Sequence, residues 1–239
     1  MPEVVDLGGF AKQSIALKRR TSLADGAADL LREMILLNKL SPGMPLPERD
    51  ICAALGISRT PLREAIRLLN VEGLIEYSAA RRPKVANPSL QEIAAYLRVQ
   101  GALEALGGEL ACANATDQEL ENIAGLNREM IAMSGKEEPL VSFKRDMNFH
   151  CQIIAAGRNS PLVDTHATYN ARLWRARFVS SQRKMGRGST LREHQEIVDA
   201  LLERDPKKTA KALKHHLDTA VSNISEVLEE QSRQLSSVL

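Results

Sequence analysis

Residues 47–85 read PERDICAALGISRTPLREAIRLLNVEGLIEYSAARRPKV, and this stretch decides the fold of the N-terminal part of the chain. Pro47 suits the first turn of a short helix, because that position needs no backbone N–H. Gly56 ends this helix, and a longer helix is predicted from about Ser58 to Gly73. The buried stripe of the longer helix consists of apolar residues spaced at i, i+4 and i+7: Leu62, Ile66 and Leu69. Two helices joined by such a tight turn predict a helix-turn-helix.

A row of arginines follows another face of the longer helix. Arg59, Arg63 and Arg67 recur at i, i+4 and i+8, which places three guanidinium groups in a line about 12 Å long. Arginine matches phosphate oxygens and the guanine edge in the major groove. A solvated arginine face is the usual explanation of such spacing. Here, however, the short helix, the glycine turn and the helix caps available at Ser58 and Thr60 occur together, and the combination predicts a helix that reads duplex DNA.

Two short apolar runs after this helix predict a small hairpin. Residues 74–77 and 83–86 are expected to pair as strands around the basic tip Ser78-Ala79-Ala80-Arg81-Arg82. A hairpin behind a helix-turn-helix makes a winged helix. Arg81 and Arg82 at its tip suit the DNA backbone or the adjacent minor groove.

An amphipathic helix is predicted ahead of this unit, over residues 22–39. Thr21 or Ser22 caps it, and the run Ser41-Pro42-Gly43 stops it, because proline cannot continue the hydrogen-bond ladder. Residues 1–20 show no strong periodicity and end in a basic run. They are expected to form an arm that is either a solvated tail or a contact to the DNA backbone.

Composition narrows the remaining classes of protein. Aromatic residues make up 3% of the 239 residues, which favours packed helices over a β-sandwich. The net charge of +2 is too small for general polyanion binding, so a nucleic-acid role depends on local clusters of arginine. Three scattered cysteines indicate reduced thiols, and the sequence contains neither a secretory apolar region nor an apolar run long enough to span a bilayer. We therefore expect a cytoplasmic protein with no membrane partner.

After a short linker at Asn87-Pro88-Ser89, the pattern is helical almost throughout. The expected stops or breaks are glycines: Gly135, Gly157, Gly186 and Gly188. The predicted helices cover residues 90–107, 116–134, 138–156, 160–183, 187–204 and 206–230. Helices of this length predict an antiparallel bundle with a core large enough for a ligand cavity.

Ionisable residues in this half can bind a metal. Asp146 and His150 lie at i, i+4 on one predicted helix, whereas His194 lies on a later helix and the pair His215-His216 on the last one. One carboxylate and three imidazoles suit Zn²⁺, Ni²⁺, Mn²⁺ or Fe²⁺. By spacing alone, however, an Asp-xxx-His pair is more often a surface pair. The same residues would also allow a metalloenzyme with a two-His, one-carboxylate site, although no general base or nucleophile stands out beside them.

The DNA-reading stretch resembles the winged-helix domain of GntR-type bacterial transcription regulators. The matching residues are Leu46-Pro47-Glu48-Arg49, Ile57-Ser58-Arg59-Thr60-Pro61-Leu62-Arg63-Glu64-Ala65, Leu68 and Glu72-Gly73-Leu74-Ile75. The resemblance covers roughly residues 20–88 and implies four contacts to operator DNA: Arg49, Arg59, Thr60 and Arg63. One departure is Pro83, because the family's wing usually has glycine after the arginine at its tip. The turn of the wing must therefore be made differently here.

The C-terminal half resembles the FCD ligand domain of the FadR-like subgroup of these regulators. The matching pieces are Asp146-Met147-Asn148-Phe149-His150, Asn159-Ser160-Pro161-Leu162, His194-Gln195-Glu196-Ile197 and His216-Leu217. The resemblance implies a divalent metal held by four residues: Asp146, His150, His194 and His216. It also implies a small effector beside the metal, often an organic acid or a sugar acid.

The residues that would hold the effector are less clearly marked. Members of the family commonly carry arginine three residues before the pair that corresponds to Leu103-Glu104, and this chain has Gln100 there. This departure weakens the expectation of a simple carboxylate effector. The expected effector contacts are Arg98, Gln100, Arg172 and Arg175, with Arg177 as a further candidate.

These patterns together predict a mainly α protein. Residues 1–20 form the arm, residues 21–88 the winged helix-turn-helix and residues 89–239 an all-α antiparallel bundle. We expect a homodimer that binds an inverted repeat in double-stranded DNA and is controlled by its effector, with repression as the commoner mode. A regulator whose metal is only structural and an all-α metalloenzyme are the alternatives.

Overall fold

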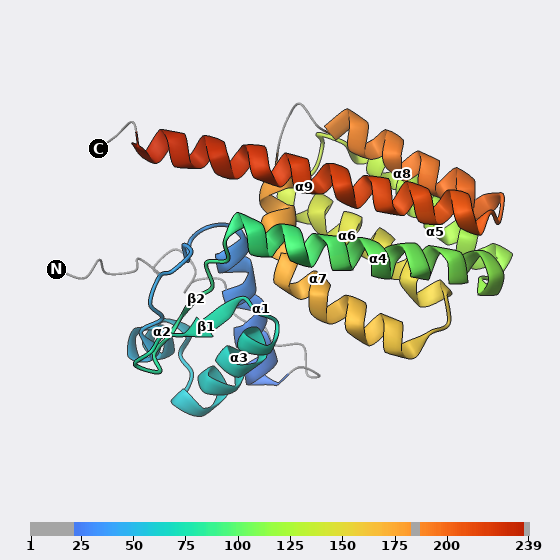
Figure 1. Cartoon of the computed structure of the whole chain (residues 1–239). Coiled ribbons are helices and arrows are strands. Elements are labelled where there is room, and N and C mark those ends of the chain that lie inside the picture. The colour runs from blue at the N-terminus through green and yellow to red at the C-terminus, as the bar shows by residue number, and fades with distance from the viewer. Residues whose placement is uncertain (1–21, 183–186, 237–239) are drawn as a thin grey trace. The chain divides into compact units, whose positions relative to one another are not determined.

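The computed structural model describes residues 22–182 and 187–236. These residues form two compact units that divide between Asn87 and Pro88 (Figure 1). The N-terminal unit contains short helices and a small sheet, and the C-terminal unit is entirely helical.

The N-terminal unit is a winged helix-turn-helix, as the sequence predicts. Its elements are α1 (Leu23–Leu36), α2 (Glu48–Leu55), α3 (Arg59–Val71), β1 (Ile75–Tyr77) and β2 (Pro83–Val85). Ser22 caps α1 through a capping box, in which its side chain accepts from the Asp25 N–H and the Asp25 carboxylate accepts from the Ser22 N–H. Gly56 ends α2 with a left-handed backbone at φ 65°.

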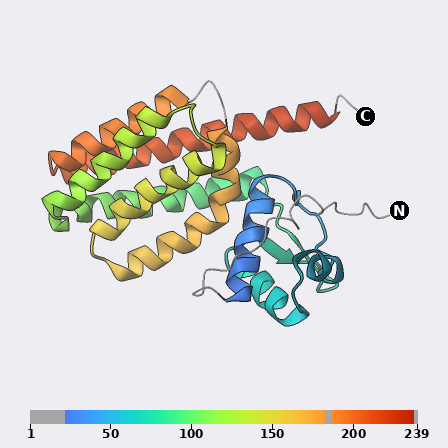
Figure 2. The same cartoon turned by 180° about the vertical axis from the view of Figure 1, so that it is seen from behind.

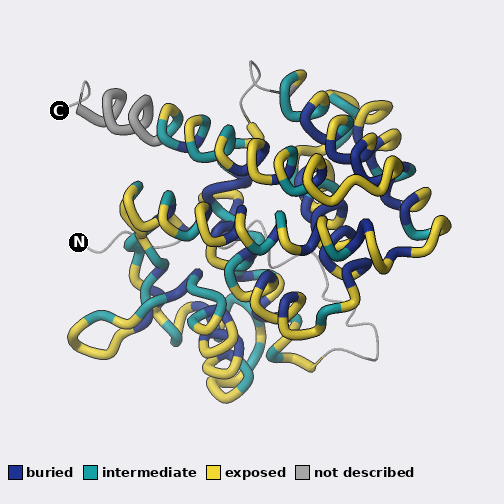
Figure 3. Tube along the Cα trace, turned by 45° about the vertical axis from the view of Figure 1, so that its right-hand side comes forward, coloured by how far each residue is buried: buried dark blue, intermediate teal, exposed yellow. Residues whose placement is uncertain are grey.

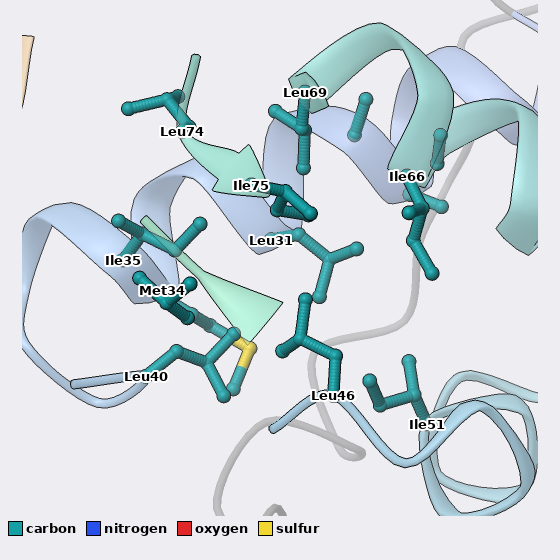
Figure 4. Close-up of a cluster of buried hydrophobic side chains, with 14 of the residues drawn as sticks. Leu31, Met34, Ile35, Leu40, Leu46, Ile51, Ile66, Leu69, Leu74 and Ile75 are labelled. Atoms are coloured by element: carbon teal, nitrogen blue, oxygen red, sulfur yellow. The ribbon is translucent and has the colours of Figure 1, made fainter. Parts of the chain in front are cut away.

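Apolar side chains from every element fill the core of this unit. Figure 4 shows Leu31 of α1 near Ile66 and Leu69 of α3, Ile35 of α1 on the opposite side of the cluster, and Ile51 of α2 at its edge. Each of these residues is at most 3% exposed. Burying such a side chain contributes about 1.5–3 kcal/mol, so this core holds α3 against α1 and keeps the opposite face of α3 free.

An ion pair at the surface adds to this packing. Arg32 of α1 donates two hydrogen bonds to Glu72, which follows the last residue of α3, with Nε–Oε2 at 2.9 Å and Nη2–Oε1 at 2.6 Å. Such two-pronged pairs fix orientation as well as distance. The C-terminal end of α3 is therefore tied to α1.

The wing makes its turn without a glycine. β1 and β2 are antiparallel, and Pro83 lies opposite Tyr77 at the end of the ladder. Arg81 takes the left-handed conformation at φ 55°, and the turn closes through hydrogen bonds from the Ser78 N–H to the Arg82 carbonyl (2.9 Å) and from the Arg81 N–H to the Ser78 carbonyl (2.8 Å). A non-glycine residue at positive φ is uncommon, and here Arg81 supplies the left-handed position of a turn that contains no glycine.

The C-terminal unit is a helical bundle. Its described helices are α4 (Leu90–Asn114), α5 (Asp117–Met133), α6 (Pro139–Ala156), α7 (Ser160–Ser181), α8 (Arg187–Leu202) and α9 (Pro206–Ser236). α9 lies along α4, and α4 also contacts α6 and α7 (Figures 1 and 2). Figure 3 shows the buried residues of these helices turned toward one another. Within the part of the chain that the structure describes, no helix is long and apolar enough to cross a membrane.

One predicted helix end is wrong. The helix expected over residues 90–107 continues to Asn114 as α4, through the pair Gly107-Gly108. A Cβ on Gly107 would collide with Ile154 of α6, and a Cβ on Gly108 would lie 2.7 Å from the Cγ2 of Thr209 of α9. These glycines therefore allow three helices to approach closely, and they do not stop α4.

Other differences are smaller. α9 extends to Ser236, past the predicted end at residue 230, and Gly188 lies inside the first turn of α8. The features predicted at Thr21, at Gly186 and in the arm of residues 1–20 lie outside the described residues.

Replacing Gly108 tests whether close packing is its role. We expect Gly108→Ala to lower the free energy of unfolding by about 1–3 kcal/mol, measured by urea denaturation, because the added methyl group meets α9. Gly125→Ala on α5 is the matched control. A Cβ there meets only the far end of the Arg128 side chain at 3.7 Å, so stability should stay the same or rise by up to about 1 kcal/mol. Similar losses in the two variants would contradict the packing role.

Candidate functional site

Three histidines from three helices meet inside the bundle. His150 of α6, His194 of α8 and His216 of α9 are buried, and each offers a ring nitrogen within 4.8 Å of the others. Asp146 lies one turn before His150, and its Oδ1 is 3.3 Å from the Nε2 of His194. His215 is exposed, because adjacent residues on a helix point in different directions. The structure thus brings together the four residues expected from the sequence.

Several nitrogens of this cluster form no hydrogen bond with the described residues. Both ring nitrogens of His194 and the Nε2 of His150 are buried without such a partner. Leaving a buried polar atom unsatisfied costs about 1–3 kcal/mol. Burial lowers the pKa of His194 well below its usual value, and the nearby His216, His150 and Arg177 lower it further. The His194 imidazole is therefore neutral near pH 7, with a lone pair available on one ring nitrogen, and the donor set fits a divalent metal.

Two carboxylates orient the histidines from outside the cluster. Glu193 accepts a hydrogen bond of 2.8 Å from the Nδ1 of His216. The Oε2 of Glu104 lies 2.7 Å from the Nδ1 of His150. A carboxylate on the Nδ1 side leaves Nε2 to face a metal, and such partners orient the histidine ligands of metal sites.

Sequence reasoning did not identify these two carboxylates as parts of the site. For Glu104 the sequence did contain a signal. Gln100 and Glu104 lie three and seven residues after Leu97, on the buried face of α4, where apolar residues are expected. A charged residue within an otherwise apolar stripe is rarely buried without a partner. For Glu193 only its position beside His194 pointed to a role.

Glu104 is surrounded by further polar groups. Its Oε1 lies 3.4 Å from both the Nε2 of His166 and the Nη1 of Arg177, and it accepts a hydrogen bond of 3.2 Å from Gln100. Burial alone would raise the pKa of the Glu104 carboxyl, but His150, His166 and Arg177 hold that pKa well below its usual value. Glu104 is therefore an anion inside the bundle.

A pocket of about 120 Å³ opens beside the histidine cluster. Three of the cluster residues line it: Asp146, His194 and His216. Arg177 of α7 also lines it, together with Ser180 and Thr219. The pocket thus combines an arginine, several serine and threonine residues, apolar side chains and candidate metal ligands.

The residues expected to contact an effector lie elsewhere. Gln100 is fully buried and donates to Glu104, and it does not line the pocket. Arg172 is exposed and bonded to the hydroxyl of Tyr96 at 3.3 Å. Arg98 and Arg175 are also absent from the pocket lining. Arg177, the further candidate, is the arginine that the structure brings to the pocket.

The predicted DNA-contacting residues of the helix-turn-helix are exposed on the N-terminal unit. Arg49, Ser58, Arg59 and Thr60 are exposed, as are Arg81 and Arg82 at the wing tip. Ser58 occupies the N-cap position of α3, but its side chain makes no capping hydrogen bond, and Thr60 lies inside the helix. Neither hydroxyl therefore caps α3 by a hydrogen bond, although Ser58 stands at the N-cap position.

Two arginines of this face already have partners on the same unit. The Nε of Arg63 donates to Glu48 of α2 at 2.9 Å, which leaves its Nη groups directed away from that bond. The guanidinium of Arg67 lies 3.6 Å from the Glu64 carboxylate. Within the described residues Arg59 makes no such bond, so it is the simplest of the three α3 arginines to test by substitution.

Comparison with known proteins identifies both units. Residues 23–83 match the family described as "Bacterial regulatory proteins, gntR family", and residues 95–219 match the FCD domain. The chain is 28% identical over 205 residues to a "Probable D-xylose utilization operon transcriptional repressor" of Paenarthrobacter nicotinovorans, covering 83% of this chain and 87% of that protein. It is 29% identical over 231 residues to the "Glc operon transcriptional activator" of Escherichia coli K12, covering 87% and 91%.

Solved structures share the fold. E. coli McbR/YncC superposes with a TM-score of 0.73 at 18% identity, covering 86% of this chain and 98% of that chain. A GntR protein from Rhodococcus sp. RHA1 superposes with a TM-score of 0.70 at 24% identity, covering 86% and 99%. At these sequence identities the structural similarity establishes a shared fold only.

Proposed function

The chain belongs to the gntR family of bacterial transcription regulators that carry an FCD domain, and we propose that a small effector bound beside a metal in its FCD domain controls its binding to operator DNA. The observation that carries this proposal is the buried set of Asp146 and three histidines with unsatisfied nitrogens, which borders a pocket lined by Arg177. The relatives named above are a repressor and an activator of transcription. A sensing role fits this set better than catalysis.

The metal would be held by Asp146, His150, His194 and His216, and Zn²⁺, Ni²⁺, Mn²⁺ and Fe²⁺ all suit such ligands. When bound, it supplies positive charge that attracts an anionic effector. The chain's own groups do the rest. Glu193 orients His216, and Arg177 offers hydrogen-bond donors to a carboxylate.

The effector is proposed to be a small organic acid or sugar acid. The pocket volume of about 120 Å³ is somewhat smaller than the roughly 150 Å³ cavity that holds benzene in an engineered protein. Arg177 suits a carboxylate, and the hydroxyl groups of Ser180 and Thr219 suit hydroxyl substituents. These features support a compact hydroxylated acid better than a long or aromatic ligand.

DNA recognition is assigned to residues 21–88, and effector control to residues 89–239. We expect α3 to enter the major groove, while Arg49 of α2 and the wing tip contact the DNA beside it. The eight expected contacts of the unit are Arg49, Ser58, Arg59, Thr60, Arg63, Arg67, Arg81 and Arg82. Two copies would read an inverted repeat, because the half-sites of such a repeat are related by the same two-fold symmetry as a dimer. Repression relieved by the effector is the expected mode.

The exposed face of α4 supports the homodimer. Six exposed residues, which exposed Arg98 borders, recur with alternating spacings of four and three: Ala95, Val99, Ala102, Leu106, Glu109 and Ala113. Five of the six are apolar, and this spacing is that of a helix seam that packs against another helix. Val99 and Leu106 are 40% and 43% exposed, which is a large exposure for apolar side chains on one helix face. We name this face the α4 seam.

Arg59→Ala tests the DNA contact. We expect affinity for operator DNA, selected from a random duplex library with the wild-type protein, to fall by about 1–3 kcal/mol, measured by fluorescence anisotropy at physiological salt. Arg128→Ala, on an exposed helix of the bundle, removes the same charge and should leave affinity unchanged. Unchanged operator affinity in Arg59→Ala would remove that residue from the contact set.

Removal of His194 tests the metal site. Zn²⁺ at about 100 times its dissociation constant should stabilise the folded wild-type protein by about 2.7 kcal/mol, observed as a rise in Tm at pH 7.5. The rise should shrink at pH 5.5, because protonated imidazoles do not bind metal. His194→Ala should lose the response and the exposed neighbour variant His215→Ala should keep it. A folded His194→Ala protein that still releases operator DNA with the identified effector would make the metal purely structural.

Leu106→Glu tests the dimer. Placing a carboxylate in the middle of the α4 seam should convert a dimer to a monomer in light scattering coupled to size-exclusion chromatography, because the charge would have to be buried. Ile131→Glu on α5 is the control, since Ile131 is 46% exposed and lies outside the seam. A Leu106→Glu protein that stays dimeric would argue against this interface.

A further inference from the structure

The two oxygens of the Glu104 carboxylate serve different partners. Oε2 lies 2.7 Å from the Nδ1 of His150, a proposed metal ligand. Oε1 faces His166, Arg177 and Gln100 at 3.4, 3.4 and 3.2 Å. One carboxylate therefore joins a ligand on α6 to a polar group on α7.

Burial makes these contacts difficult to replace with water. Glu104 is 0% exposed, and His150, His166 and Arg177 are 1%, 2% and 6% exposed. Inside such a region each lost contact leaves a charge or donor without compensation. A change at one partner of Glu104 therefore alters the electrostatic interaction of Glu104 with its other partners.

Arg177 is the partner of Glu104 that also lines the pocket. Its Nη1 is shared between the Oε1 of Glu104 at 3.4 Å and the Oδ1 of Asn170 at 3.1 Å. The contact to Glu104 is long for a charge-assisted hydrogen bond. An anionic group in the pocket would offer Arg177 a stronger partner.

We propose that Glu104 is a positioning residue that couples the effector pocket to the metal centre through Arg177 and His150. This inference rests on the proposed metal and effector site. When an effector anion draws Arg177 away, Glu104 directs more of its negative charge to the Nδ1–H of His150. His150 then becomes a stronger metal ligand. By reciprocity, the bound metal strengthens effector binding by the same factor.

Co²⁺ alone is the probe that tests this coupling in the full-length protein. Its affinity is measured by calorimetric titration, and its visible spectrum reports the ligand set. Glu104→Gln should weaken Co²⁺ binding by about 10–100-fold. Arg177→Met, which imitates the withdrawn guanidinium, should tighten Co²⁺ binding several-fold. In the Glu104→Gln background, Arg177→Met should have no further effect.

A matched variant separates this coupling from simple electrostatics. Glu193→Gln should also weaken Co²⁺ binding, through His216, but Arg177→Met should still tighten binding in that background. Tightening of equal size with and without Glu104 would mean that Arg177 acts through space, and the proposal would be wrong.

A second measurement covers the case in which Glu104→Gln does not fold. In the Zn²⁺-loaded protein, Arg177→Met should shift the Nδ1–H proton resonance of His150 and leave that of His216 in place. A His150 resonance that does not move overturns the coupling. Absence of Co²⁺ binding by the wild-type protein, or equal binding by His194→Ala, would instead overturn the proposed metal site and, with it, this inference.

Discussion

A buried carboxylate constrains the whole C-terminal bundle. Moving a charge such as that of Glu104 out of water costs several kcal/mol, and it is retained only where positive groups and donors surround it. Those groups come from three helices: Gln100 from α4 itself, His150 from α6, and His166 and Arg177 from α7. Neutralising this carboxylate therefore requires α4, α6 and α7 to lie close together at this level of the bundle. The same arrangement places His150 beside His194 and completes the metal-binding set.

The faces of helix α4 carry different kinds of side chain, and one of them holds the buried carboxylate. The glycine pair at 107–108 lets α6 and α9 pack closely against α4. The polar pair Gln100 and Glu104 faces inward within an apolar stripe. The α4 seam faces outward, with its apolar side chains exposed. One helix thus provides the packing, the buried charge and the proposed dimer surface.

Local patterns in the sequence predicted most helices and strands, but contacts between elements far apart in the sequence could not be predicted. The cap at Ser22 and the turn at Gly56 depend on neighbouring residues, so the sequence signal is direct. The predicted helix end at residue 107 was wrong, because the role of Gly107 and Gly108 depends on Ile154 and Thr209, far along the chain. The metal ligands were predicted through resemblance. Glu193, and Arg177 as the arginine of the pocket, required the structure, since neither periodicity nor spacing says which side chains converge across three helices.

The geometry of α4 limits how a change at the metal can reach the DNA-binding unit. α4 begins at Leu90, just after the division at Asn87 and Pro88, and Glu104 follows 14 residues later (104 − 90), which is about 21 Å along a helix. Ile154 and Leu213 fill the space beside Gly107 and Gly108, so side chains there have little room to repack and absorb a displacement. A displacement of α4 at Glu104 would therefore be passed along the helix and would not be absorbed locally. Because α4 directly follows the linker and also carries the α4 seam, such a displacement would reach the linker, the proposed dimer contact or both.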